Sequence, residues 1–165
     1  MDLRRYWRHL LMSPVRERAM FPRATLDAIQ AEIAAQEKVH RGQLVLIVEA
    51  ELTSIQLWRG LGSRERAREV FGCHGVWNTG ENNGVLIYLL LADRHVEIVA
   101  DRGIDAKAGA GEWERICRMM EGHFRAGRFE EGAIAGVRAV SSLLERHFPG
   151  DGGARNELPD RPILI

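Results

Sequence analysis

The order of apolar and polar residues divides the chain into segments with helical spacing and shorter runs that are apolar almost throughout. The first segment, residues 3–12, is predicted to be a short helix in which arginines surround an apolar face made of Leu3, Trp7, Leu10 and Leu11. We expect a terminal helix docked on its own domain. A contact with a membrane surface or a partner is the alternative.

Four more segments repeat apolar residues at helical spacing and are predicted to be helices: residues 25–40, 63–72, 111–126 and 129–148. Three β-rich runs are predicted to be strands: residues 43–52, 85–92 and 96–100. The run at 85–92 is apolar throughout, so this strand has no face for solvent and helices must cover both sides of its sheet. The pattern predicts a three-layer α/β/α sandwich with a small mixed sheet.

The length of 165 residues is that of one domain with its own core. We expect a basic amphipathic segment at 1–22 and the folded domain at 23–149. The tail at 150–165 mixes glycine, proline and charged residues, and we expect it to be mobile.

Composition narrows the classes of function. Apolar residues make up 45% of the chain and charged residues 28%, which is typical of a globular protein, and the formal net charge is zero. Nothing in this balance favours nucleic acid as a partner. No apolar run is long enough for a transmembrane segment or a signal peptide, so we expect a cytoplasmic protein.

The two cysteines, Cys73 and Cys117, are too few for a disulfide framework. With His74 they would form at most an incomplete zinc or nucleophile cluster. Cys117 stands beside Ile116 in a predicted helix, and we expect it to be a small core residue.

The strands at 85–92 and 96–100 are separated by a few polar residues, so they should form an antiparallel hairpin. A turn centred on Arg94 would place Leu90 opposite Ile98 and Ile87 opposite Asp101. Asn83 would then come level with Asp105. The two ends of this hairpin are therefore different places.

At the end far from the turn, oxygen-bearing side chains from two chain segments are expected to meet: Glu81, Asn82, Asn83, Asp101 and Asp105. Carboxylate and amide oxygens are the ligands that Ca²⁺ and Mg²⁺ prefer. Without a cation, three carboxylates would repel one another, and Arg102 offsets only part of that repulsion. The alternative is that these residues form turns, because Asn, Asp and Gly also gather at strand ends for backbone reasons.

Several of these residues also carry a resemblance to the TPM domain family, which is known from thylakoid-lumen proteins with reported phosphatase activity and from bacterial relatives. The matching positions run in the family's order over about residues 25–148. They are Phe71, Trp77, Asn83-Gly84-Val85-Leu86, Asp93-Arg94, Gly103-Ile104-Asp105, Phe124, Gly127, Phe129 and Gly132.

The resemblance implies an α/β/α sandwich and divalent-cation binding in acidic loops at one end of the sheet. It also implies a link to phosphatase activity or to the upkeep of membrane protein complexes. Three departures from the family pattern stand out. Asn82 replaces a frequent Asp and should weaken a cation site, the glycine-rich loop becomes Asp101-Arg102-Gly103, and the secretion signal and membrane anchor of many members are not seen.

Two classes of function follow. The first is a cation-binding module that contacts a protein partner, either a membrane complex or another TPM protein. The second is a metal-dependent phosphomonoesterase in which Glu81, Asp101 and Asp105 hold the cation and Arg102 contacts phosphate. No residue pattern identifies a nucleophile or a general acid, so the sequence favours the binding module.

Overall fold

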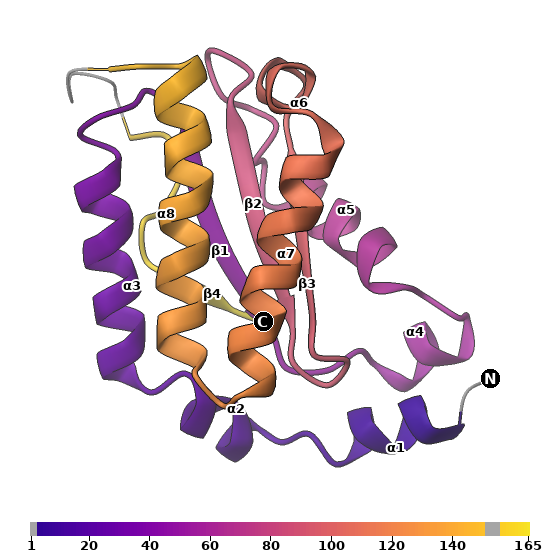
Figure 1. Cartoon of the computed structure of the whole chain (residues 1–165). Helices are drawn as coiled ribbons and strands as arrows, with labels where there is room; N and C mark the ends of the chain where they lie inside the picture. Colours follow the sequence, from indigo (N-terminus) through magenta and orange to yellow (C-terminus); the bar gives the residue numbers. More distant parts are fainter. Residues whose placement is uncertain (1–2, 151–155) are drawn as a thin grey trace.

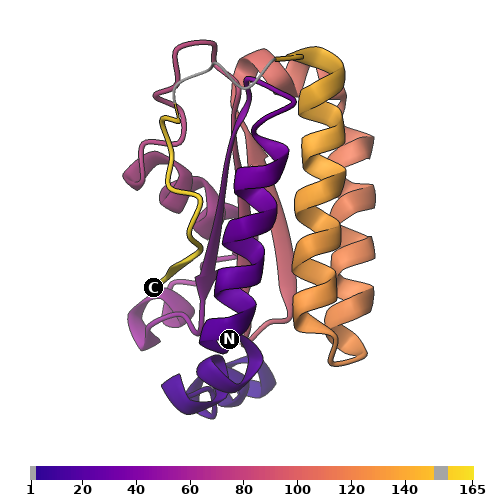
Figure 2. The same cartoon turned by 90° about the vertical axis from the view of Figure 1, so that its left-hand side faces the viewer.

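A computed structural model describes residues 3–150 and 156–165 of the chain. The elements in chain order are α1 (Leu3–Leu10), α2 (Pro14–Met20), α3 (Arg23–Gln36), β1 (Gln43–Glu49), α4 (Ser54–Trp58), α5 (Ser63–Cys73), β2 (Gly84–Leu90), β3 (His95–Ala100), α6 (Arg102–Ala108), α7 (Ala110–Arg125), α8 (Phe129–His147) and β4 (Ile163–Leu164). Figures 1 and 2 show α3, α7 and α8 on one side of the sheet and α4 and α5 on the other. The predicted three-layer α/β/α sandwich is confirmed.

The sheet has the strand order β3-β2-β1-β4 and is mixed. Strand β1 is parallel to β2 and to β4, whereas β2 and β3 form an antiparallel hairpin. Every residue of β1 and of β2 is buried. Burial on both faces is what an uninterrupted apolar strand requires, since alternate side chains point to opposite layers.

Alternate strand residues build two separate cores. Leu46 and Ile87 pack with α3, α7 and α8 in the larger core, while Ile47 and Tyr88 pack with α4 and α5 in the smaller one. The helices supply residues at helical spacing, such as Ile29 and Ile33 of α3, both fully buried. The sheet is therefore held rigidly in the middle, and its two ends carry the loops.

The predicted register of the hairpin was wrong. Leu90 pairs with His95 and Ile87 pairs with Ile98, so neither residue meets the partner expected from a turn centred on Arg94. The pairing of β2 with β3 ends at Leu90 and His95, while the backbone N–H groups of Leu91 and Ala92 still donate to the carbonyls of Glu49 and Ala50. The turn then spans residues 91–94 and closes with Arg94 in the left-handed region, at φ 55°.

Four elements were missing from the prediction: α2, α4, α6 and β4. Helix α4 begins with a capping box, in which the Thr53 hydroxyl accepts from the Gln56 N–H and the Gln56 side chain accepts from the Thr53 N–H. Strand β4 lies within the segment expected to be a mobile tail. It pairs with β1, and the side chain of Gln43 accepts from the backbone N–H groups of Glu157 and Leu158. Residues 151–155 of that segment lie outside the described residues.

The first helix docks on its own domain, but not by its apolar face. Leu3, Trp7, Leu10 and Leu11 are between 52% and 61% exposed instead of facing the domain. Helix α1 docks through its polar side, where His9 is buried and both Arg5 and His9 contact Asp93 at the hairpin tip. Among the described residues, no helix is both long enough and apolar enough to cross a membrane.

Candidate functional site

The candidate site lies at the end of the sheet where β1 and β2 begin and β3 leaves for α6, at the top of Figure 1. The Asp101 N–H donates to the Gly84 carbonyl at 2.8 Å, which extends the hairpin by one step beyond its last strand pair. Asn83 directly precedes Gly84, and its carbonyl accepts from the Gln43 N–H of β1. Asn83 and Asp101 are therefore neighbours at adjacent strand ends, although the register differs from the predicted one.

Asn83 is buried, and its contacts fix the direction of its side-chain amide. Its Nδ2 donates to the Arg41 carbonyl at 3.0 Å, and its backbone N–H donates to the Thr79 hydroxyl at 3.1 Å. The Oδ1 atom is buried without a hydrogen-bond partner among the described residues. An amide oxygen buried in this way costs free energy unless something else binds it.

Asp101 is 6% exposed and has the same feature. Its Oδ1 accepts from the Arg102 N–H at 2.7 Å at the start of α6, while its Oδ2 is buried with no partner in the described chain. Carboxylate and amide oxygens are hard ligands for a divalent cation. A cation that contacts Asn83 and Asp101 would satisfy both oxygens, so these residues fit the group that the family resemblance implies.

The turn before β2 adds backbone oxygens at the same end. A Cβ placed on Gly103 would lie 2.4 Å from the Asn82 carbonyl oxygen and 3.1 Å from that of Glu81. Only glycine allows the first turn of α6 to approach these carbonyls so closely. Asn82 itself adopts the left-handed conformation, at φ 52°, which few residue types other than Asn and Gly accept readily.

The remaining predicted ligands have other partners. The carboxylate of Glu81 lies 3.3 Å from Arg41 and is about half exposed. Asp105 accepts from the Trp113 indole N–H at 2.9 Å and lines a groove of about 400 Å³ between β3 and α7. Arg102 is exposed. Within the described part of the chain, no three His, Cys, Asp or Glu side chains gather as a metal-binding group.

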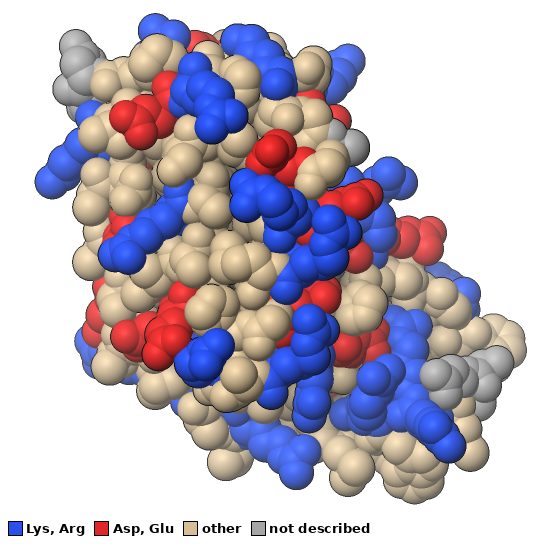
Figure 3. Space-filling view, in the orientation of Figure 1, with Lys and Arg blue, Asp and Glu red and all other residues tan. Residues whose placement is uncertain are grey.

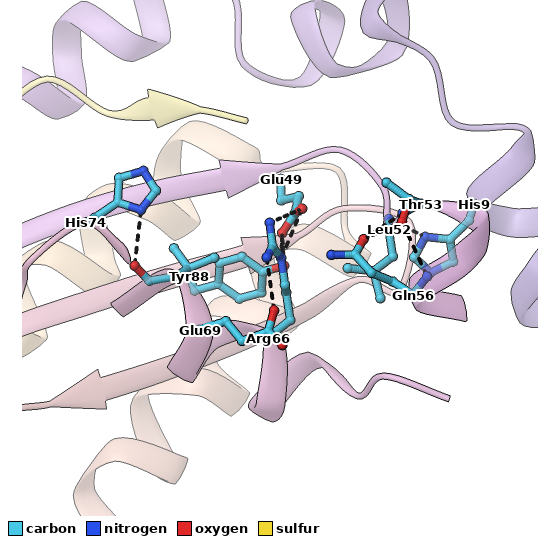
Figure 4. Close-up of polar contacts among 10 residues, drawn as sticks. His9, Glu49, Leu52, Thr53, Gln56, Arg66, Glu69, His74 and Tyr88 are labelled. Atoms are coloured by element: carbon cyan, nitrogen blue, oxygen red, sulfur yellow. Dashed lines mark hydrogen bonds and ion pairs between the residues drawn. The ribbon is translucent and has the colours of Figure 1, made fainter. Parts of the chain in front are cut away.

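A second polar cluster lies in the smaller core and was not foreseen from the sequence (Figure 4). The Tyr88 hydroxyl donates to Glu49 Oε2 at 2.5 Å, and the Arg66 guanidinium holds the same carboxylate through both of its oxygens. Burial raises the pKa of Tyr88, and the Glu49 carboxylate raises it further. Tyr88 is fully buried and Glu49 is 5% exposed, so this cluster orders the core and does not meet a substrate.

The thiols give no sign of nucleophilic chemistry. Cys73 is exposed and Cys117 is half-buried, and both are free. Burial, followed by the charge of Glu97, raises the pKa of the Cys117 thiol to about 12. A thiol with so high a pKa stays protonated and is a poor nucleophile, which agrees with the core role expected for Cys117.

Comparisons with known proteins agree with this architecture. The chain is similar to the NMR structure of the BA42 protein from the psychrophilic bacterium Bizionia argentinensis, with 26% identity and a TM-score of 0.73, over 86% of this chain and 93% of that one. It is also similar to the solution NMR structure of the N-terminal domain of a protein from P. gingivalis, with 26% identity and a TM-score of 0.60, over 76% of this chain and 77% of that one. No curated protein matches the sequence.

The family comparison covers most of the folded part. The TPM domain matches residues 15–143, which include the strands of the hairpin and both residues with unpartnered oxygens, Asn83 and Asp101. The chain belongs to the TPM domain family.

Proposed function

We propose that this protein is a divalent-cation-binding module that contacts a protein partner, and that Asn83 and Asp101 hold the cation. The observation that carries the proposal is the pair of buried oxygens without partners at adjacent strand ends. A buried acceptor left without a partner costs about 1–3 kcal/mol. Two such atoms at neighbouring strand ends are expected where a ligand normally binds them.

The proposed ligands are Asn83 Oδ1 and Asp101 Oδ2, with the backbone carbonyls of Glu81 and Asn82 as further oxygens. Calcium suits this set better than magnesium, because Ca²⁺ accepts irregular combinations of carboxylate, amide and carbonyl oxygens whereas Mg²⁺ demands near-octahedral geometry. In this proposal Glu81 and Asn82 act through the backbone. The Asp105 carboxylate, which accepts from Trp113, is not a ligand.

The proposal that the protein binds a partner rests on the surroundings of the proposed ligands. They lie in connecting loops at the rim of the sandwich, and neither the groove beside Asp105 nor the cavity at the opposite end of the molecule is lined by Asn83 or Asp101. Trp77, in the loop that leads to these residues, is 54% exposed. An exposed tryptophan beside a cation-ordered loop suits contact with a protein, for which we propose a membrane complex or another TPM protein, in the cytoplasm.

The test is calorimetric titration of Ca²⁺ and of Mg²⁺ into the metal-stripped protein. Asp101→Asn keeps the side-chain shape and the oxygen that caps α6 but removes the charge, and it should weaken binding at least tenfold, on the order of the 1.4 kcal/mol expected from losing one charged ligand. Asp105→Asn is the matched control and should bind the cation as the wild type does.

Three results would contradict the proposal in different ways. If neither Ca²⁺ nor Mg²⁺ binds the wild type saturably, these polar residues serve only to form turns. If Asp101→Asn and Asp105→Asn weaken cation binding equally, Asp105 is a ligand too, as the sequence predicted. Binding unaffected by either substitution would place the cation elsewhere in the molecule.

The alternative function is a metal-dependent phosphomonoesterase, and the observation in its favour is Arg102. This residue follows Asp101 directly and is exposed, so its guanidinium is available to bind a phosphate next to the proposed cation. Hydrolysis of p-nitrophenyl phosphate that depends on Ca²⁺ or Mg²⁺ and is lost in both Asp101→Asn and Arg102→Ala would support it. Cation binding without such hydrolysis would contradict the phosphomonoesterase and favour the binding module.

A further inference from the structure

Helix α1 presents its apolar side to solvent. Side chains of an α-helix advance by about 100° per residue, so Leu3, Trp7, Leu10 and Leu11 share one side while Arg5 and His9 lie on the opposite side. The contacts agree, because Arg5 and His9 bind Asp93 and the four apolar residues are more than half exposed. The helix is therefore docked by its polar side, which is the reverse of an ordinary surface helix.

The exposed apolar surface continues beyond α1. Val15 at the start of α2 is 74% exposed, and Ile55 and Trp58 of α4 are 64% and 79% exposed. Helix α4 lies beside α1, since residues of both line one shallow cavity that includes Leu10 and Leu57. Large apolar side chains exposed on neighbouring helices of an otherwise charged protein mark a place where something binds.

The polar residues around this surface are almost all positive. Residues 3–23 contain six arginines and a single glutamate, whereas the whole chain has no net charge. Figure 3 shows the basic side chains gathered along the lower edge of the molecule, over α1 and α2. Arginines beside an exposed tryptophan and leucines are the combination that binds the interface of an anionic membrane.

A cavity of about 330 Å³ adjoins the same surface, between α1, α2, the hairpin tip and the turn from α7 to α8. Leu11 belongs both to the exposed side of α1 and to the wall of this cavity. Four arginines line it, namely Arg8, Arg16, Arg94 and Arg125, together with apolar side chains such as Phe129. A cavity with a basic rim and an apolar wall suits a phosphate group attached to an acyl chain.

From these observations we infer that the α1–α2 end of the molecule docks on the surface of an anionic phospholipid bilayer. The apolar side of α1 enters the boundary between headgroups and acyl chains, and Arg8, Arg16 and Arg94 at the rim of the cavity contact lipid phosphates. A second copy of the chain fits this surface less well, because two such basic faces would repel each other. A nucleic acid would leave Trp7 and its apolar neighbours exposed.

The test is flotation of the full chain with vesicles made of equal parts phosphatidylglycerol and phosphatidylcholine, beside vesicles of phosphatidylcholine alone. The protein should float with the anionic vesicles and not with the neutral ones, and added salt should weaken binding. Trp7→Ala should reduce the partition coefficient roughly tenfold. Arg16→Glu should reduce it at least about fivefold.

Trp77→Ala is the matched control. Trp77 is as exposed as Trp7, at 54% against 52%, but it lies in the loop that leads into the start of β2, at the opposite end of the sheet from the hairpin tip. Its substitution should leave flotation unchanged. Because Trp7 is half exposed, Trp7→Ala should also keep the thermal transition of the wild type, which separates lost docking from lost folding.

Three outcomes would overturn the inference: no flotation of the wild type with anionic vesicles, equal loss in Trp7→Ala and Trp77→Ala, or a dimer in solution that Trp7→Ala dissociates. The last outcome would assign the face to a second copy. Flotation should not depend on chelator, because the proposed cation ligands lie at the other end of the sheet. The docking inference and the cation proposal can therefore fail separately.

Discussion

The Nε2 atom of His9 lies 3.2 Å from a carboxylate oxygen of Asp93, and this pair joins α1 to the hairpin tip. His9 Nδ1 accepts from the Leu52 N–H at 2.9 Å, which places the ring proton on Nε2, toward Asp93. Arg5 binds the same carboxylate at 2.8 Å. Burial by itself would raise the pKa of Asp93, but the contacts with His9 and Arg5 outweigh it and hold the pKa well below its usual range.

Asp93→Asn should therefore loosen α1, because it removes the charge that Arg5 and His9 bind. Breaking a largely buried ion pair from one side leaves the other charges without compensation, and we expect a loss of roughly 2–4 kcal/mol in the free energy of unfolding. Urea denaturation measures the loss. Trypsin should also cleave faster at the arginines of α1.

The pH dependence of this effect has a definite sign. A carboxyl group with a lowered folded pKa stabilises the fold above its unfolded pKa, so the difference between wild type and Asp93→Asn should shrink as the pH falls below about 4. Asp27→Asn is the control, because Asp27 is half exposed in its ion pair with Arg161 and its loss should cost less than about 1 kcal/mol. Equal costs at the two positions would show that Asp93 does not anchor α1.

The fold could be predicted from the sequence because the run at 85–92 has no polar side, which forces helices onto both faces of the sheet. The orientation of α1 could not, because it depends on contacts between residues more than 80 positions apart, such as Arg5 and Asp93. Periodicity reports which residues share a side of a helix, but not which side meets the domain. Helix α4 was predictable in principle, since Thr53 and Gln56 have the spacing of a capping box.

The candidate site was also predictable only in part. Asn83 and Asp101 end adjacent strands, so the hairpin brings them together under any register close to the true one. The side-chain directions of Glu81 and Asp105 depend on Arg41 and on the Trp113 indole, which come from other parts of the chain. Sequence spacing carries no information about those contacts.

Tyr88→Phe should destabilise the smaller core only modestly, because Arg66 continues to hold both oxygens of Glu49. Losing one buried hydrogen bond should cost roughly 1–2 kcal/mol in thermal or urea unfolding. Glu49→Ala should cost more, roughly 3–5 kcal/mol, since it leaves the Arg66 charge without its partner.

A titration checks the same cluster independently. Burial and the Glu49 carboxylate both raise the pKa of Tyr88, so its hydroxyl should stay protonated as long as the chain is folded. In a Tyr6→Phe background, tyrosinate absorbance should appear together with loss of circular dichroism and not before it. Ionisation of Tyr88 in the folded protein would mean that the carboxylate contact is absent.

Gly103→Ala should strain the contact between α6 and the turn before β2, because the new Cβ would lie 2.4 Å from the Asn82 carbonyl oxygen. That atom is backbone and has little room to move, so we expect a loss of roughly 1–3 kcal/mol in the free energy of unfolding. Gly122→Ala in α7 is the control, because no neighbouring atom lies within 4 Å of its Cβ. It should leave stability unchanged or raise it by up to about 1 kcal/mol.

Glu37 links the C-terminal segment to pH. Burial, followed by the negative charge of Asp160, raises the pKa of Glu37 to about 8, while the Leu44 N–H works in the opposite direction. One of its carboxyl oxygens is buried without a partner in the described chain. The folded protein therefore holds a proton on Glu37 that the unfolded chain releases at lower pH.

A raised acid pKa makes the fold less stable as the pH rises, since the unfolded state loses its proton first. Between the ordinary value of 4.5 and about 8, the contribution of Glu37 should lower the melting temperature of the wild type progressively. Glu37→Gln, which is neutral at every pH, should show a flatter dependence over this window and should be the more stable protein at its upper end. Asp160→Asn should narrow the window, because removing the nearby charge lowers the pKa of Glu37. A slope unchanged by Glu37→Gln would show that this group does not titrate in the window.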